Sequence, residues 1–312
     1  MATNKEERKV ILAYLCVCIV WGSTYLAIRI GVSEFPPAIF AGIRFVVAGL
    51  LMVGFAWLKG LEFPKTPIDI RRIAVVGLFL LLGGNGLVVW AEQWVHSGIA
   101  SLLVATVPLF MAILELMLPN RKSIGFKGWS GLILGFAGVV LLVFTHSDSG
   151  AIDLKGALIL LTGTLMWAMG SIYSKSFQAS GSIVSHIGIE MLAGGIGLSI
   201  VGMILGETSR FHVTLRGIGA LLYLIFFGSI LAYSCYIYIL QKWPAAKAGT
   251  YAYVNPPVAV LLGSLILDEP LSFHVIASTG VILMGVFLVQ TSKGVPASQG
   301  NQHHKTAEEM ET

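Results

Sequence analysis

Charged residues are scarce in this chain of 312 amino acids. Only 12% are Asp, Glu, Lys or Arg, whereas 56% are hydrophobic. A soluble globular domain carries about 25% charged residues, so this sequence has too little polar surface to face water on every side. The composition therefore excludes an ordinary soluble domain and indicates an integral membrane protein. The net charge of +4 gives no reason to expect nucleic acid as a partner.

Cysteines are few, and familiar catalytic motifs are missing. Cys16, Cys18 and Cys235 lie in apolar runs, at no spacing typical of a disulfide framework or a zinc site. The sequence has no His-Glu-x-x-His and no Gly-x-Ser-x-Gly motif. We therefore expect no metal, no cofactor and no enzymatic activity. A membrane-embedded enzyme or a channel is the alternative class, although no carbonyl-filter motif or acidic ring favours a channel.

Long apolar runs fill the rest of the chain. A bilayer core of about 30 Å needs about 20 mostly apolar residues per helix. The first run is too long for the core of a signal peptide, so it predicts a retained helix, and no linker has room for a soluble domain. We expect ten transmembrane helices, at residues 10–32, 37–58, 73–90, 98–118, 128–145, 154–174, 183–205, 217–240, 248–267 and 274–291.

Lys and Arg are distributed unevenly between the connecting segments. If the N-terminus is cytoplasmic, fifteen of them lie in cytoplasmic segments and only three, Lys155, Arg210 and Arg216, lie outside. Membrane proteins carry this excess on their cytoplasmic side. The bias predicts an even number of helices with both termini in the cytoplasm.

The two halves of the chain share a pattern at a nearly constant offset. Arg44 corresponds to Glu190 at an offset of 146, and Pro108 corresponds to Pro256 at 148. We therefore expect two five-helix repeats, of which the second enters the membrane inverted because five is odd; secondary transporters use this architecture. The expected parts are a cytoplasmic N-terminus at 1–9, the repeats at 10–145 and 154–291, and a disordered cytoplasmic tail at 292–312.

Several short motifs occur in a characteristic order. They are Trp21-Gly-Ser-Thr-Tyr25, Pro36-Pro37 followed by Gly42 and Arg44, the two mid-run prolines, and Leu267-Asp-Glu-Pro-Leu-Ser272. Over residues 10–291 the chain resembles EamA-type carriers of the drug/metabolite transporter superfamily. The resemblance implies a central cavity lined by helices 1, 3, 4, 6, 8 and 9, and export of amino acids or other small metabolites. The first repeat lacks the acidic pair of Asp268 and Glu269, which leaves the role of that pair open.

Aromatic and amide side chains within the runs, several of them near the middle, are candidates to line the cavity, with core packing as the alternative. Indole N–H and phenol O–H groups need partners in a hydrocarbon environment. Such a site suits small zwitterions or amphipathic organic molecules better than phosphorylated anions, which call for clusters of Arg and Lys. The predicted substrate-binding residues are Trp21, Tyr25, Asn85, Trp90, Trp167, Tyr173, Tyr233, Tyr253 and Asn255.

Two prolines and two charges within the runs complete the candidate site. Pro108 and Pro256 predict paired helix kinks beside the cavity. Arg44 and Glu190 are intramembrane charges, which point to function by default; a purely structural role is the alternative, and we expect no direct ion pair between them. Glu190 is our candidate to load and release a proton during transport.

The sequence thus predicts a secondary transporter of the cell (plasma or inner) membrane that exports small metabolites by alternating access. Its expected partners are a small-molecule substrate and the lipid bilayer, with protons as the candidate coupling ion. A proton-coupled carrier for drugs or toxic compounds is the alternative function. The pattern does not indicate which substrate is carried or which oligomeric state is formed.

Overall fold

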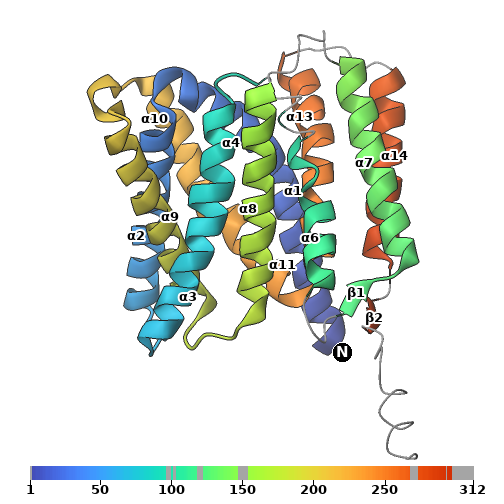
Figure 1. Ribbon diagram of the computed structural model, residues 1–312, viewed down its shortest axis with the longest axis horizontal. Helices are drawn as coiled ribbons and strands as arrows, with labels where there is room; N and C mark the ends of the chain where they lie inside the picture. The colour runs from blue at the N-terminus through green and yellow to red at the C-terminus, as the bar shows by residue number, and fades with distance from the viewer. Residues whose placement is uncertain are drawn as a thin grey trace, which may run out of the picture.

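The computed structural model describes residues 2–95, 100, 103–117, 122–146, 154–267, 273–292 and 294–296. This part of the chain is helical apart from one short two-stranded ribbon, which confirms the all-helical class. Its helices group into ten segments, one for each apolar run (Figure 1). Six of them, within the described residues, are long and apolar enough to cross a membrane.

Five segments come from the first half of the chain, and the third consists of three consecutive helices. The segments are α1 (Ala2–Glu34), α2 (Pro37–Leu58), the run of α3 (Pro67–Gly77), η1 (Leu78–Asn85) and α4 (Gly86–Ala91), then α6 (Val107–Leu116) and α7 (Phe126–His146).

The second half repeats this plan, with a short 3₁₀ helix, η2 (Glu207–Arg210), between its second and third segments. The segments are α8 (Leu154–Ser176), α9 (Ile183–Ile204), the run of α10 (Leu215–Tyr223), η3 (Leu224–Tyr233) and α11 (Ser234–Lys242), the pair α12 (Ala245–Gly249) and α13 (Tyr251–Leu267), and α14 (Phe273–Gln290).

Capping side chains set several helix starts. The side-chain oxygens of Thr66, Ser182 and Thr214 each accept a hydrogen bond from the amide three residues later, at the starts of α3, α9 and α10. These amides have no partner inside a helix, so a capping oxygen satisfies them.

Some expected boundaries differ in the structure. The first helix begins at Ala2 and the third at Pro67, because polar residues extend these helices beyond their apolar parts. The tail at 292–312 was expected to be disordered, but its start is not. Gly294–Pro296 forms strand β2, which pairs antiparallel with β1 (Lys122–Ile124). Backbone hydrogen bonds between the two strands order these three residues. The rest of the tail, and part of the run at 98–118, lie outside the described residues.

The two halves share an unusual local feature. η1 and η3 are π-helices, and they begin 146 residues apart and end 148 residues apart in sequence. Longer π-helices are rare, and π-bulges are frequent at functional sites. Each of these helices therefore changes its helical register near the middle of its segment.

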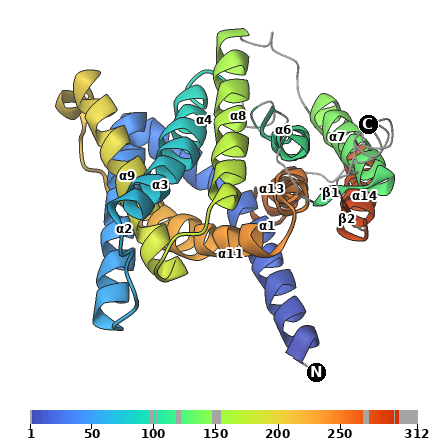
Figure 2. The ribbon, with the colours of Figure 1, turned by 60° about the horizontal axis from the view of Figure 1, so that its bottom comes forward.

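Two helix pairs form the sides of the molecule. α2 packs along α9, and α7 packs along α14 at the opposite side (Figures 1 and 2). Glycine allows the second pair to approach closely, since a Cβ atom on Gly285 would overlap the backbone of Gly135. The glycines of α7 thus serve intramolecular packing.

The contacts in the centre of the molecule are equivalent in the two halves. α1 packs against η3 and α13, while α8, its counterpart, packs against η1 and α6. η1 is the counterpart of η3, and α6 is the counterpart of α13. Each of the two central helices therefore makes the same pair of contacts with the other half of the chain. Both halves therefore contribute the same kinds of segment to the space between α1 and α8.

Candidate functional site

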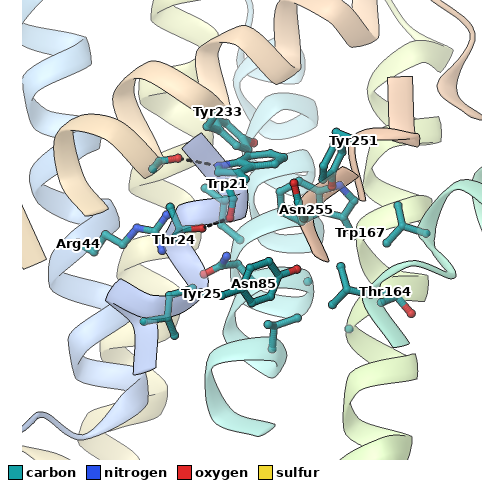
Figure 3. Close-up of a pocket in the computed structure, with 18 of the residues that line it drawn as sticks. Trp21, Thr24, Tyr25, Arg44, Asn85, Thr164, Trp167, Tyr233, Tyr251 and Asn255 are labelled. Atoms are coloured by element: carbon teal, nitrogen blue, oxygen red, sulfur yellow. Dashed lines mark hydrogen bonds between the residues drawn. The ribbon is translucent and has the colours of Figure 1, made fainter. Parts of the chain in front are cut away.

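A cavity of about 80 Å³ lies between the halves, lined by segments of α1, α2, η1, α8, η3 and α13 (Figure 3). Val104, Val107 and Val88 close it from the fourth helical segment and α4. A buried water needs roughly 10–15 Å³ of cavity volume, so this cavity has room for about five to eight waters. This is the space of one small organic molecule.

The structure brings six of the nine predicted substrate-binding residues together around this cavity. They come from both halves of the chain and line one continuous surface (Figure 3). The six are Trp21, Tyr25, Asn85, Trp167, Tyr233 and Asn255.

The other three predicted residues lie elsewhere. Trp90 packs against Trp94 at 5.5 Å, and Tyr173 packs against Phe177 at 5.2 Å. The hydroxyl of Tyr253 donates a 3.0 Å hydrogen bond to the Leu132 carbonyl in α7. Successive residues of a helix are about 100° apart around its axis, so lying within an apolar run does not decide which face a side chain occupies.

Tyr251 lines the cavity and was not predicted to do so. It lies four residues before Asn255, which also lines the cavity, and residues at that spacing share a helix face. Tyr253, between them, points away. The spacing of four from a predicted lining residue is the signal that would have identified Tyr251.

An aromatic cluster forms one wall of the cavity. The Trp21 ring centroid lies 5.5 Å from that of Trp167 and 4.8 Å from that of Tyr251, both in edge-to-face contacts. Trp21 Nε1 donates a 2.9 Å hydrogen bond to the Gly228 carbonyl in η3, and Trp167 Nε1 donates to the Tyr236 hydroxyl at 3.1 Å. Since both indole N–H groups have partners, this wall presents ring faces and edges.

The polar groups at the cavity are few. Arg44 is 3% exposed, and its Nε donates a 2.8 Å hydrogen bond to the Ser229 hydroxyl. Its Nη1, together with the side-chain carbonyls of Asn85 and Asn255, has no hydrogen-bond partner among the described residues. The cavity therefore combines an apolar, aromatic surface with one cationic group and two amide oxygens.

A second cavity of about 540 Å³ lies near the ends of α8 and α11, beside the connection from α8 to α9. Its lining includes Glu190, His186 and Lys175. Glu190 is 4% exposed, and its Oε2 accepts a 2.8 Å hydrogen bond from the hydroxyl of Tyr233, which lines the central cavity. This hydrogen bond joins the linings of the two cavities.

The two prolines occupy different positions in their helices. Pro108 lies in the first turn of α6, after a break at Ala105 and Thr106, where proline costs no helical hydrogen bond. The prediction that Pro108 lies in the middle of a helix is therefore wrong. Pro256 lies within α13, beside Pro257, and a kink there stays a prediction.

Glu92 is a buried acid that was not among the predicted site residues. It follows α4 and is 2% exposed, and neither of its carboxylate oxygens has a hydrogen-bond partner within the described part of the chain. Arg29 interacts with it electrostatically. An acid two residues after an apolar run is the signal that would have identified it.

The EamA-like transporter family matches the chain twice, over residues 8–144 and residues 154–291. The chain belongs to the EamA-like transporter family. It is accordingly a multi-pass membrane transporter and not an enzyme. Each match covers one half of the chain, in agreement with the repeat that was expected from the sequence offsets.

Individual relatives of this EamA-like transporter cover almost its whole length. It is 41% identical to the uncharacterized inner membrane transporter YedA of Escherichia coli strain K12, over 90% of each chain. It is 25% identical to the uncharacterized transporter YoaV of Bacillus subtilis strain 168, over 90% of this chain and 96% of the relative. A crystal structure with 19% sequence identity matches with a TM-score of 0.73 over 90% of this chain and 96% of the other, which shows a shared fold.

Proposed function

We propose that this EamA-like transporter exports small amphipathic metabolites, such as amino acids, by alternating access of the central cavity. The observation that carries the proposal is the cavity itself. It lies between the two halves and combines aromatic rings, two amide oxygens and a single cationic side chain. Ligand sites of this kind, mostly apolar with a few placed polar groups, bind small organic molecules.

The arrangement of the helices supports an alternating-access mechanism. We propose that the halves are inverted repeats, at residues 10–145 and 154–291, because the central contacts of α1 and α8 are equivalent. Inverted repeats give outward-open and inward-open packings of similar energy, with the substrate near the midplane. The π-helices η1 and η3, both at the cavity, are our candidates for the segments that change register.

The charge bias and two structural relationships support one orientation of the protein in the membrane. Lys242 Nζ lies 2.8 Å from Glu6 Oε1, so the end of α11 is beside the start of α1. β2 lies at the same end of the molecule as the N-terminus (Figure 1). We propose that this end is cytoplasmic and that the protein resides in the inner membrane, as the name of the YedA relative indicates for that protein.

Transport should be tested in proteoliposomes that contain the full chain. Vesicles preloaded with one unlabelled amino acid at a time are diluted into the labelled compound, and counterflow is measured. Counterflow with apolar amino acids, and its loss in Trp167→Ala, would support the proposal. No counterflow with any amino acid or related amphipathic compound, in protein that remains monodisperse, would contradict it. Comparing metabolite export between overexpressing and deletion strains then tests the direction.

The size of the cavity bears on the alternative of drug efflux. Room for about five to eight waters suits a molecule with a similar number of heavy atoms, and typical drug pockets are several times larger. This supports metabolites over bulky drugs. In the counterflow assay, preference for a large lipophilic cation over every amino acid would favour the alternative.

We propose proton coupling through Glu190 as a second part of the function. The observation that favours it is the hydrogen bond to Tyr233, because Glu190 lines one cavity and Tyr233 the other. Opening of the two cavities in turn would expose the carboxyl to water from different sides, so that it takes up a proton on one side and releases it on the other.

Glu190→Gln tests this coupling because it keeps the shape and removes the titration. We expect the variant to exchange substrate but not to accumulate it under a pH gradient. If it still concentrates substrate against its gradient, Glu190 is structural and the carrier is a uniporter or uses another group. Exchange measured in the same vesicles shows whether the variant is folded and binds substrate.

A further inference from the structure

We infer that Arg44 binds a carboxylate of the transported molecule and thereby sets which substrates the cavity accepts. The inference rests on the proposed transport function and adds to it a named specificity-determining residue. It assigns to one side chain the recognition of one charge on the substrate.

Arg44 is buried in the protein and lines the central cavity. It lies eight residues into α2, counting from Pro37, and is 3% exposed. Its side chain extends from α2 toward Thr24 of α1 (Figure 3). The guanidinium carbon lies 4.7 Å from the centroid of the Phe45 ring. The charge is therefore held inside the protein, at the wall of the cavity that it lines.

The hydrogen bonds of Arg44 are incomplete. A guanidinium has five N–H donors, and Nε is occupied by the Ser229 hydroxyl at 2.8 Å. Nη1 has no acceptor in the part of the chain that the structure describes. A donor that is buried and charged is costly when it lacks a partner, so the protein fixes Nε of the guanidinium and leaves Nη1 to be satisfied by an acceptor that the described residues do not supply.

No acidic side chain neutralises Arg44 among the described residues. The salt bridges within that part of the chain are Lys65–Glu62 and Lys242–Glu6. Glu190 accepts its hydrogen bond from Tyr233 instead. A buried charge is stable only with a counter-charge or full hydrogen bonding, and a substrate anion in the cavity supplies both.

The type of anion follows from counting charges. Arg44 is the single charged side chain among the described residues that line the central cavity. One planar guanidinium matches a carboxylate, whereas phosphate recognition calls for a cluster of cations. We therefore assign the class of substrate as small molecules with one carboxylate.

The rest of the molecule must match two hydrogen-bond acceptors and an aromatic wall. The side-chain carbonyls of Asn85 and Asn255 line the same cavity and lack donors among the described residues. An amino group on the substrate supplies N–H donors to them, and an apolar side chain fits the rings of Trp21 and Trp167. The combination describes an apolar amino acid whose carboxylate contacts Arg44.

The test compares three analogues that differ at the carboxylate. Leucine, leucinamide and isoamylamine have the same apolar body, and they carry a carboxylate, a neutral amide and no group, respectively. Each competes for counterflow into proteoliposomes that contain the full-length wild type. We expect leucine to bind at least about tenfold more tightly than either analogue, because charge-assisted hydrogen bonds are lost in both.

Variants then locate the source of this preference. In Arg44→Gln we expect the acid to lose its tenfold advantage over the amide. In Arg44→Lys we expect an intermediate preference, since the charge remains but the planar fork does not. Arg29→Gln is the control: it removes an arginine of α1 that lies outside the cavity lining and should leave the preference unchanged.

The outcomes separate the role of Arg44 from the proposed transport function. A wild type that accepts all three compounds equally overturns the role of Arg44 while the proposed transport function stands. The same follows if Arg44→Gln still prefers the acid as strongly as the wild type. A wild type that binds none of the three overturns the proposed substrate class together with the inference. Because the wild-type comparison needs no variant, the inference stays testable even if Arg44→Gln does not fold.

Discussion

The hydroxyl of Tyr233 donates a 2.8 Å hydrogen bond to Oε2 of Glu190, and the two residues line different cavities. Tyr233 is the last residue of η3, and Glu190 is the eighth residue of α9. Both side chains are buried. A movement of η3 against α9 would therefore change the environment of the carboxyl and the shape of the central cavity together.

Tyr233→Phe should uncouple these two effects. The variant keeps the ring at the cavity wall but removes the donor to Glu190, which leaves a buried acceptor without that partner at a cost of about 1–3 kcal/mol. We expect accumulation driven by a pH gradient to fall at least about tenfold, with counterflow affected less. Tyr238→Phe, on α11 and outside both linings, is the control. Equal losses in accumulation and counterflow would contradict the link.

Trp21→Phe should weaken the aromatic wall. The substitution removes the 2.9 Å hydrogen bond to the Gly228 carbonyl in η3. It also replaces the indole that contacts Trp167 and Tyr251 with a smaller phenyl ring. We expect a loss of stability of about 0.5–2 kcal/mol and a raised KM for counterflow. Trp57→Phe is the matched control, because Trp57 is 73% exposed. Thermal unfolding in detergent and the concentration dependence of counterflow measure the two effects, and equal KM changes in both variants would argue against the wall.

Gly285→Ala should separate α7 from α14. A Cβ atom at this position overlaps backbone atoms of Gly135, which cannot move aside as a flexible side chain does. We expect the melting temperature to fall by several degrees, in line with an overpacking cost of about 1–3 kcal/mol. Gly280→Ala, in the same helix, meets open space within 4 Å and should unfold like the wild type. A Gly285→Ala variant as stable as Gly280→Ala would show that the close approach is unnecessary.

We expect Asp69 and Ser180, which are hydrogen-bonded to each other, to contribute cooperatively to the free energy of unfolding. Asp69 Oδ2 accepts hydrogen bonds from the Ser180 hydroxyl at 2.7 Å and the Ser180 amide at 3.2 Å, which ties the start of α3 to the α8–α9 connection. A double-mutant cycle with Asp69→Asn and Ser180→Ala measures their interaction. We expect a coupling energy of about 0.5–2 kcal/mol in thermal or chemical unfolding, and an additive cycle would show no cooperation between them.

Reporter fusions test the proposed topology. Fusions after Lys65, Lys122 and Lys175, and at the C-terminus, should report cytoplasm, because the excess of Lys and Arg lies on that side. Fusions near Asp148 and Thr208 should report the outer side. An external C-terminus would exclude an even number of membrane crossings.

Several properties of this transporter were determined by the sequence alone. The number of helices, the all-helical class and the family follow from local quantities, namely the length and apolarity of each run and the residues in its motifs. The offset of about 147 between the halves likewise pairs residues such as Arg44 and Glu190 without knowledge of the fold. These features survive in the structure because a bilayer forces each apolar run to satisfy its backbone hydrogen bonds internally.

The tertiary structure decided which faces of those helices meet. Tyr251 and Asn255 reach the cavity whereas Tyr253 bonds to α7, although all three lie in the same run. The π-helices add to this, since an extra residue in a turn rotates everything beyond it by about 100° relative to a regular helix. For Arg44, the sequence predicted how far into its helix the residue lies. Its contact with Ser229 of η3 depends on how α2 packs against a segment 185 residues away, which the sequence did not predict.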